Sequence, residues 1–347
     1  MPVYLCASVL QQIALKILII RFSSIGDIVL TTPVVRCLKQ QCIGVEVHYL
    51  TKASYKEVLA ANPYIDKLHL LDKNEKPLLQ TLKGEGYDYI IDLHHNIRSL
   101  RFKLALGVRS RSFDKLNWAK WLLVKLKINL LPDHHIVDRY MATLLFLGIK
   151  NDGQGLDYFI PENSQLPENQ LAPVYRAGYV AFVIGGQHET KMLPREKILA
   201  ICQAIQTPVV LLGGPEDKLK GDWIAAQGNG KIFNASGSFK LNESVDLLRK
   251  AQLILTHDTG LMHIAAAFRQ KIIVIWGNTV PAFGMYPYLP DNQDFLSFEQ
   301  TLECRPCSKI GYSACPKGHF KCMQQQDTAA IAAAVRKRLP YTADKKS

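Results

Sequence analysis

The residues best suited to chemistry lie in segment 253–268, where an apolar run ends at a polar, glycine-containing turn and resumes with helical periodicity. This pattern predicts a strand, a turn and a helix. A helix that begins at such a turn presents unpaired backbone N–H groups and the positive end of its dipole, which suits a phosphate. Asp258, Thr259 and Gly260 lie at the turn, and His263 follows one helical turn later. The alternative is an ordinary capped helix with a structural histidine.

Two other strand ends in the same half of the chain carry residues suited to a nucleotide. After one predicted strand, Gly185 and Gly186 leave space for a diphosphate, and Lys191 supplies a compensating charge. After the next strand, Glu216 could bind a ribose hydroxyl or simply open the following helix. Each loop alone is weak evidence, but three such loops in one domain together favour a ligand site.

The first strand of the chain, in contrast, ends at a loop that carries a glycine and a carboxylate. Gly26 permits a tight turn, and Asp27 stands at the start of the next helix. Asp27 could cap that helix, or it could take a proton from an attacking hydroxyl. A dinucleotide-dependent dehydrogenase is excluded, because the loop lacks Gly-x-Gly-x-x-Gly and the second strand ends in Thr51 and Lys52 instead of an acidic ribose ligand.

Strand-like and helical runs alternate along both halves of the chain, which predicts an α/β protein with two Rossmann-like domains. We expect an N-terminal domain at 1–160 that includes an extension at 1–15, a proline-rich linker at 161–177, a second domain at 178–326 and a final segment at 327–347. Ligands of open parallel sheets bind beyond the carboxyl ends of the strands, so both sets of loops are expected to face a central cleft.

The positive charge of the chain is concentrated in one stretch. The net charge of the 347 residues is +12, and between Arg98 and Lys127 there are nine basic residues against one acidic residue. Trp118 and Trp121 lie among these cations, which favours contact with an anionic membrane surface over a solvated helix packed on its own domain. No recognisable nucleic-acid module accompanies the charge, so we expect no nucleic-acid partner.

The cysteines and the apolar runs bear on the compartment. No run is long enough to span a bilayer and no secretory signal precedes the first strand, so a cytoplasmic protein with reduced thiols is expected.

Four cysteines form a group with spacings of two, seven and six residues: Cys304, Cys307, Cys315 and Cys322. They could hold a structural Zn²⁺ or remain plain reduced thiols, and a disulfide is less favoured.

Four motifs together resemble glycosyltransferase family 9, the lipopolysaccharide heptosyltransferases. They are the segments 19–33, 87–99, 190–194 and 257–263, of which the last, His-Asp-Thr-Gly-Leu-Met-His, is the most specific. The resemblance extends over nearly everything from residue 16 to residue 339. It implies a GT-B fold with an acceptor-binding N-terminal domain, a nucleotide-binding C-terminal domain and a final helix that returns toward the first domain.

The resemblance also implies a reaction. Heptose would pass from ADP-heptose, with inversion and without a required cofactor, to a lipid A/Kdo-type acceptor in the lipopolysaccharide inner core, at the cytoplasmic face of the inner membrane. Asp27 would be the general base, and Lys191 would stabilise the diphosphate leaving group. The implied nucleotide-sugar site comprises Gly185, Gly186, Thr190, Lys191, Glu216, Phe239, Asp258, Thr259, Gly260 and His263, and the implied acceptor site comprises Ser24, Gly26, Asp92, His94 and Arg98.

Two other functions stay open at this level. The same fold could use another nucleotide sugar or acceptor, because these preferences depend on pocket shape. A non-catalytic protein could instead use the positive charge to bind anionic lipid or nucleic acid. The joint presence of Asp27, Lys191 and Asp258 at strand ends favours an enzyme, since a binding module has no evident need for all three.

Overall fold

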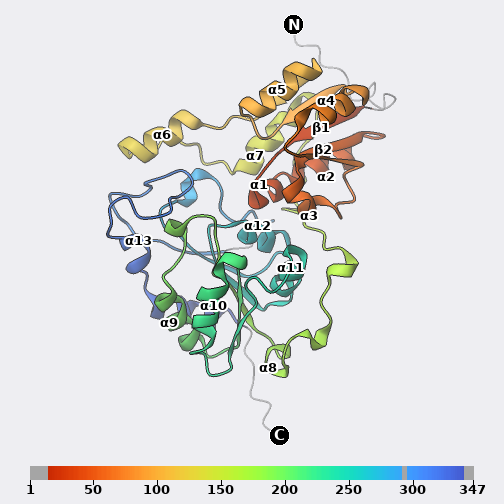
Figure 1. Cartoon of the computed structure of the whole chain (residues 1–347). Coiled ribbons are helices and arrows are strands. Elements are labelled where there is room, and N and C mark those ends of the chain that lie inside the picture. Colours follow the sequence, from red (N-terminus) through yellow and green to blue (C-terminus); the bar gives the residue numbers. More distant parts are fainter. Residues whose placement is uncertain (1–14, 291–294, 340–347) are drawn as a thin grey trace. The chain divides into compact units, whose positions relative to one another are not determined.

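The computed structural model describes residues 15–290 and 295–339 (Figure 1). Its chain divides into two compact units, the first formed by Met1–Leu116 and Asp133–Pro161 and the second by Asn117–Pro132 and Glu162–Ser347. Nearly all of the expected N-terminal extension, and residues 340–347 of the expected final segment, lie outside the described residues.

The first unit is built on a five-stranded parallel sheet with the order β3-β2-β1-β4-β5. The strands are β1 (Lys16–Ile20), β2 (Glu46–Lys52), β3 (Lys67–Leu71), β4 (Tyr89–Asp92) and β5 (Arg109–Ser112). The central strands are almost wholly apolar because helices cover the sheet on both faces.

The helices of the first unit follow the strands in alternation. They are α1 (Ile25–Val29), α2 (Thr32–Gln41), α3 (Lys56–Leu59), α4 (Glu75–Gly84), α5 (Ile97–Leu106) and α7 (Ile136–Met141), with 3-10 turns η2 (Ala53–Tyr55) and η3 (Ala142–Leu147). Helices α4 and α5 lie on one face of the sheet (Figure 1), where Leu82 and Phe102 pack against Leu18 and Leu50. The single helix predicted after β1 is two helices, because the chain turns between Val29 and Thr32.

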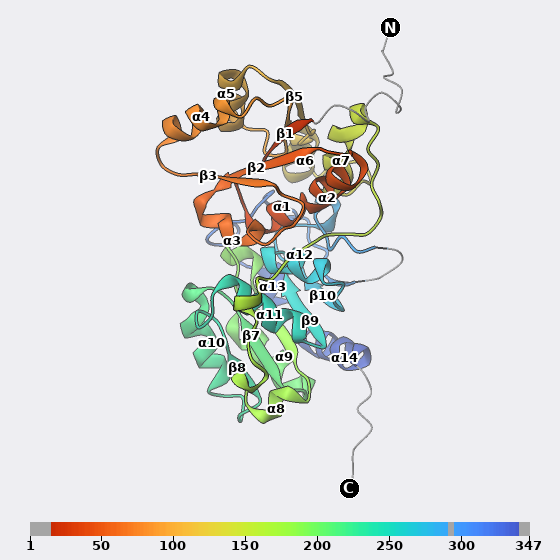
Figure 2. The same cartoon turned by 90° about the vertical axis from the view of Figure 1, so that its right-hand side faces the viewer.

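The second unit contains a six-stranded parallel sheet with the order β11-β10-β9-β6-β7-β8 (Figure 2). Its strands are β6 (Val180–Val183), β7 (Val209–Leu212), β8 (Ile232–Asn234), β9 (Leu253–His257), β10 (Ile272–Ile275) and β11 (Leu296–Phe298). Its helices are α6 (Asn117–Leu126), α8 (Pro173–Arg176), α9 (Arg195–Ile205), α10 (Lys218–Ala225), α11 (Leu241–Lys250), α12 (Gly260–Ala267), α13 (Lys321–Gln324) and α14 (Thr328–Arg338). Two parallel sheets confirm the predicted α/β class.

One face of the second sheet carries α9, α10 and α14. Ile198, Ile224 and Val335, one from each helix, are fully buried in the same apolar cluster as the inward side chains of β6 and β9. The final helix α14 packs along α9 and therefore belongs to the core of the second unit. Its predicted return toward the first domain stays a prediction.

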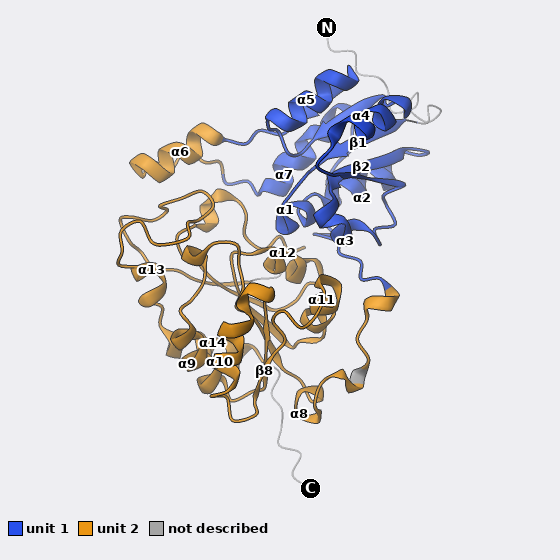
Figure 3. Cartoon of the chain, viewed as in Figure 1, with its two compact units in different colours: residues 1–116, 133–161 blue, residues 117–132, 162–347 orange. Residues whose placement is uncertain are grey.

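The partition of the chain differs from the sequence prediction in one segment (Figure 3). Residues 117–132, which include α6, group with the second unit, whereas the sequence analysis assigned them to the first domain. Lys127 explains part of this grouping, because its ammonium donates to the carbonyl oxygens of Cys304 (3.1 Å) and Pro306 (2.7 Å). Among the described residues, no helix combines the length and apolarity needed to cross a bilayer.

Candidate active site

In the first unit, the turn after β1 and the first turn of α1 hold a carboxylate against a buried guanidinium. Arg21 Nη2 lies 2.6 Å from Asp27 Oδ1. Ser24 donates to Asp27 Oδ2 from its hydroxyl (2.8 Å) and from its backbone N–H (3.2 Å). Arg21 is held in turn by the hydroxyl of Tyr140 at 3.1 Å. The Asp27 side chain keeps 22% of its surface exposed, so a substrate can still approach it.

The electrostatics of this loop fix the charge of Asp27. Burial raises the pKa of the Asp27 carboxyl, but the charge of Arg21 and the hydrogen bonds from Ser24 outweigh burial and leave the pKa below its ordinary value. Asp27 is therefore ionised at neutral pH and can accept a proton. The lowered pKa also makes this carboxylate a weak base, so it would take a proton only from a group that becomes acidic in the course of a reaction.

His94, on the loop after β4, lies within electrostatic range of this pair. Its ring packs edge-on against Phe22 at a centroid distance of 4.9 Å. Burial and the charge of Arg21 lower the pKa of His94 to about 4, so the imidazole is neutral at pH 7. Its buried Nδ1 has no hydrogen-bond partner among the described residues. Because such an atom is costly to leave unpaired, a bound hydroxyl there would be favourable.

The other predicted acceptor residues are engaged by the chain itself. Asp92 is fully buried, accepts from the backbone N–H of His94 (3.1 Å) and pairs with Lys103 Nζ at 3.0 Å. It therefore shapes the loop that carries His94 and offers no open oxygen. Arg98, on α5, pairs with Glu75 Oε1 at 3.1 Å and remains 46% exposed. The structure thus brings His94 to Asp27, whereas Arg98 forms a surface ion pair.

In the second unit, loops that follow different strands meet at the carboxyl ends of the sheet. A Cβ atom on Gly185 would collide with Asp217 Oδ2, on the loop after β7. A Cβ atom on Gly186 would lie 3.3 Å from Cγ2 of Thr259, on the loop after β9. A side chain at Gly185 would therefore displace Asp217, and one at Gly186 would press on Thr259, so three of the predicted nucleotide loops are neighbours.

A lysine and an aspartate form an ion pair at the same ends of the strands. Lys191 Nζ lies 2.7 Å from Asp258 Oδ2, with 15% and 12% of the two side chains exposed. Thr279 donates its hydroxyl to the same carboxylate oxygen at 2.8 Å. Asp258 therefore positions the ammonium of Lys191, and an incoming diphosphate would share or replace this carboxylate as the partner of Lys191.

The start of α12 has the features that a phosphate requires. Thr259 is the N-cap residue, but its hydroxyl makes no capping hydrogen bond. Thr259 Oγ1 is buried and lacks a hydrogen-bond partner among the residues described. An N-cap hydroxyl ordinarily satisfies one of the free helix N–H groups, so this helix end is left to be satisfied by a ligand. His263, one turn further along, is 3% exposed.

The remaining predicted residues have different surroundings. Thr190 is buried, and its hydroxyl accepts from the backbone N–H of Tyr312 at 2.8 Å, so it anchors the segment after the first two clustered cysteines. Glu216 is exposed on η7 (Pro215–Asp217), beyond the end of β7. Phe239 is half-buried on the loop between β8 and α11. These positions are compatible with contacts to ribose and base.

Three residues that the sequence analysis did not select lie at these strand ends. Asn278 is 1% exposed, and within the described part of the chain neither polar atom of its amide has a partner. The buried hydroxyl of Ser236 is likewise unpartnered there. Lys220 donates to the carbonyl of Ile184 at 2.9 Å and pairs with Asp217 at 3.0 Å. Asn278 follows the apolar strand β10, so a search for polar residues after the ends of apolar runs could have found it.

The four clustered cysteines carry free thiols and lie within electrostatic range of one another. None of them forms a disulfide, and burial raises the pKa of the Cys322 thiol to about 11. No three of their sulfur atoms lie within 4.8 Å of one another, since the described residues meet that criterion only at His48, His69 and Glu85. A tetrathiolate zinc site needs closer sulfurs, so the zinc prediction stays a prediction.

Two parallel α/β units of this kind are the architecture of glycosyltransferases of the GT-B type. The sequence profile of Glycosyltransferase family 9 (heptosyltransferase) matches residues 76–315, and the chain belongs to this family. The lipopolysaccharide heptosyltransferase 1 of Campylobacter coli is 23% identical over 304 residues, which cover 76% of this chain and 84% of that protein. Lipopolysaccharide heptosyltransferase 3 of Escherichia coli K12 is 26% identical over 290 residues, which cover 74% and 81%.

A solved structure supports the same fold. The Escherichia coli heptosyltransferase WaaC, solved with ADP, is similar with a TM-score of 0.67 at 18% sequence identity, and the match covers 93% of this chain and all of the other. The same protein has been solved with ADP-2-deoxy-2-fluoro heptose.

Proposed function

We propose that this protein is an inverting heptosyltransferase that moves heptose from ADP-heptose to the inner core of lipopolysaccharide without a catalytic divalent cation. The observation that carries the proposal is the free N-terminus of α12, with the unpartnered Thr259 hydroxyl and the Lys191–Asp258 ion pair beside it. The names of the relatives, and the ADP and ADP-sugar bound to the similar WaaC structure, support this donor.

In the proposed reaction, the second unit stabilises the leaving group. As the bond between the anomeric carbon and the phosphate oxygen breaks, negative charge develops on the ADP diphosphate. The N–H groups at the start of α12, the Thr259 hydroxyl and the ammonium of Lys191 would meet this charge. Each preorganised donor of this kind lowers the barrier by about 3 kcal/mol. Together these donors would neutralise the leaving group, as a divalent cation does in other transferases.

The first unit would supply the base. The oxygen of the acceptor hydroxyl attacks the anomeric carbon on the face opposite ADP, and its proton passes to Asp27 as the new carbon–oxygen bond forms. Arg21 and Ser24 keep Asp27 ionised and fix the direction of its carboxylate. His94 would contact an acceptor hydroxyl through its ring. This reaction requires Asp27 to meet the donor carbon in the loaded enzyme.

The exposed side of α6 supports an acceptor embedded in a membrane. Trp118 is 68% exposed, Trp121 47% and Leu126 55%, whereas Leu122 and Leu123 on the same helix are buried. Trp118 and Trp121 are spaced three residues apart and therefore share one face of the helix. Exposed tryptophans beside basic residues suit the headgroup region of an anionic leaflet. We therefore place the protein peripherally at the cytoplasmic face of the inner membrane, where a lipid A/Kdo-type acceptor would be reached.

The variant Asp27→Asn tests the proposal, because it keeps the size of the side chain and removes its basicity. We expect heptosyl transfer to fall by roughly 10²–10⁴-fold while ADP binding, measured by calorimetry, is unchanged. Retained turnover would remove Asp27 from the role of base. If the wild type turns over another nucleotide sugar and Asp27→Asn does not, the chemistry is the same with a different donor. If the wild type binds lipid and turns over no donor, the protein is non-catalytic.

A further inference from the structure

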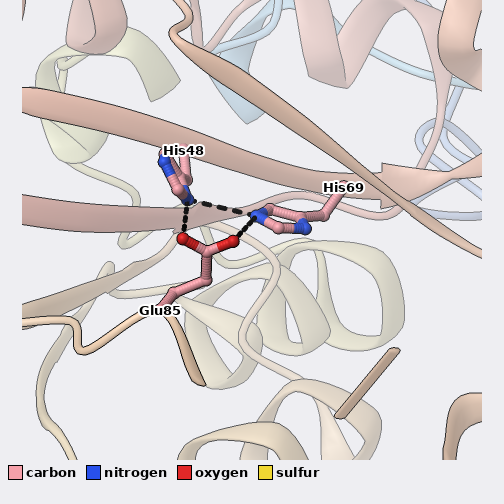
Figure 4. A group of neighbouring side chains, drawn as sticks. All are labelled: His48, His69 and Glu85. Atoms are coloured by element: carbon pink, nitrogen blue, oxygen red, sulfur yellow. Dashed lines mark hydrogen bonds and ion pairs between the residues drawn. The ribbon is translucent and has the colours of Figure 1, made fainter. Parts of the chain in front are cut away.

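A polar cluster lies in the first unit at the amino ends of the strands, away from the loop that carries Asp27. The His–His–Glu cluster consists of His48 on β2, His69 on β3 and Glu85, which follows α4 (Figure 4). Because Leu50 pairs with His69 in the register of β2 and β3, His48 and His69 project from the same face of the sheet. His48 is fully buried and His69 is 5% exposed.

The ring nitrogens of His48 and His69 face each other, and Glu85 turns one carboxylate oxygen toward each of them (Figure 4). His48 Nδ1 lies 3.1 Å from His69 Nε2, and Glu85 oxygens lie 3.8 Å and 4.0 Å from these two nitrogens. A zinc ion binds such atoms at roughly 2.0–2.2 Å, which places neighbouring ligands roughly 3.0–3.6 Å apart. The carboxylate is too far from either ring for a hydrogen bond, and it needs to move by less than about 1 Å to complete a metal site.

The orientation of His48 is fixed by a second carboxylate. His48 Nε2 lies 2.7 Å from Glu46 Oε1, so this nitrogen carries the proton and Nδ1 presents its lone pair to the cluster. Such a carboxylate on the far ring nitrogen is the usual partner of a metal-binding histidine.

Further groups surround the cluster. The Tyr87 hydroxyl lies 2.8 Å from His48 Nδ1 and 3.0 Å from His69 Nε2, where it can complete the coordination or hydrogen-bond a ligand. Lys16 and Lys67 pair with Glu85, and their charges oppose a cation. The side chain of Lys67 is 51% exposed and can turn to solvent when a metal neutralises Glu85.

We propose that His48, His69 and Glu85 bind a divalent transition-metal ion of the zinc class. Two neutral imidazoles and one carboxylate form the ligand set that such ions prefer, with Tyr87 or water completing the tetrahedron. The ion would join β2, β3 and the turn between α4 and β4. It would stabilise the fold of the first unit and take no part in glycosyl transfer.

The test is Co²⁺ titration of the metal-free full-length protein, followed by its visible ligand-field absorption. Wild type is expected to bind one equivalent, and Glu85→Gln is expected to weaken binding at least about tenfold because it removes an anionic ligand. Glu46→Gln should weaken binding by roughly 10–100-fold through the orientation of His48. Glu75→Gln, a surface substitution on α4, is the matched control and should bind like wild type.

The thiols are controlled separately with the double variant Cys304→Ser, Cys307→Ser, which should keep the same absorption. Added Zn²⁺ should raise the unfolding temperature of wild type and leave that of Glu85→Gln unchanged, a readout independent of activity. His69→Gln, checked for folding by circular dichroism, should lose binding. Equal Co²⁺ affinity of Glu85→Gln and Glu75→Gln, or loss of the absorption only in the cysteine variant, would overturn the proposal.

Discussion

The guanidinium of Arg21 lies 2.6 Å from the carboxylate of Asp27, and the same carboxylate accepts two hydrogen bonds from Ser24. This arrangement lowers the pKa of Asp27 although burial alone would raise it. A group with a lowered pKa in the folded protein stabilises the fold at pH values above its unfolded pKa, and this stability is lost as the pH falls through the folded pKa. The same contacts therefore stabilise the fold and keep Asp27 ionised, as its proposed role as the base requires.

A first prediction concerns the acid limb of the rate profile. Ser24→Ala removes the hydroxyl bond to Asp27 Oδ2 and leaves Arg21 in place. We expect the acid limb of kcat/KM in the variant to move to higher pH, because the pKa of Asp27 rises toward its ordinary value. A pH series of transfer rates measures the shift. Thr31→Ala, which removes a hydroxyl at the start of the next helix α2, is the control. An unchanged or lowered limb would show that Asp27 does not govern it.

A second prediction concerns the leaving group. Lys191→Met keeps the length and apolar body of the side chain and removes its charge. We expect kcat to fall roughly 10²–10³-fold, because the ammonium would act on charge that develops during bond breaking. Lys197→Met, on the neighbouring helix α9, should leave transfer near wild type. If Lys191→Met affects KM and not kcat, the lysine binds the donor without stabilising the transition state.

A third prediction concerns the hydroxyl of Thr259, which has no capping bond in the structure. Thr259→Val replaces the hydroxyl with a methyl group of similar size. We expect ADP affinity to fall roughly tenfold, because one hydrogen bond to a charged group is lost, while stability is unchanged or higher since a buried unpaired hydroxyl is removed. Calorimetric titration with ADP and thermal unfolding report the two effects, and lower stability with full affinity would contradict the assignment.

How much of the fold and of the candidate site could be predicted depends on whether the sequence pattern behind each feature is local. The α/β class and the loops around Gly185, Asp258 and Thr259 follow from apolar runs that end in polar turns, which are local signals. The strand β5 was not predicted, because its sequence Arg-Ser-Arg-Ser is polar and exposed and carries no apolar signal. The contact of Gly185 with Asp217 also depends on the neighbouring positions of β6 and β7, which no local pattern contains.

The His–His–Glu cluster illustrates the same limit. Its members are 21 and 16 residues apart in the sequence, and only the register of β2 and β3 brings them together. The cysteine group differs, because its spacing is conspicuous in the sequence, whereas no three of its sulfur atoms lie within 4.8 Å of one another in the structure. Its zinc site stays a prediction.

A fourth prediction concerns the membrane surface of α6. The double variant Lys120→Glu, Lys125→Glu should bind anionic phospholipid vesicles at least about tenfold more weakly than wild type, since each basic residue near such a surface contributes about 1 kcal/mol. Binding to neutral vesicles, dominated by Trp118 and Trp121, should change little. Equal binding of wild type and variant to anionic vesicles in co-sedimentation would remove α6 from the proposed docking surface.

A fifth prediction concerns the cysteines. The protein to analyse is the double variant Glu85→Gln, His69→Gln, purified without chelator, because it lacks two ligands of the His–His–Glu cluster. Any metal that it retains is held by the thiols. Stoichiometric zinc in this background would support a structural site at Cys304, Cys307, Cys315 and Cys322 that closes around the ion. Its absence, with free thiols counted by alkylation, would leave them as plain reduced cysteines.

The most direct test of the account is nucleotide release from a panel of ADP-, UDP- and GDP-sugars, in chelator and in the presence of a lipid A/Kdo-type acceptor. ADP-heptose is predicted to be consumed with acceptor-dependent release of ADP, and Asp27→Asn should abolish this release. Release that requires added divalent cation, or a clear preference for a UDP- or GDP-sugar, would contradict the proposed metal-independent transfer from ADP-heptose.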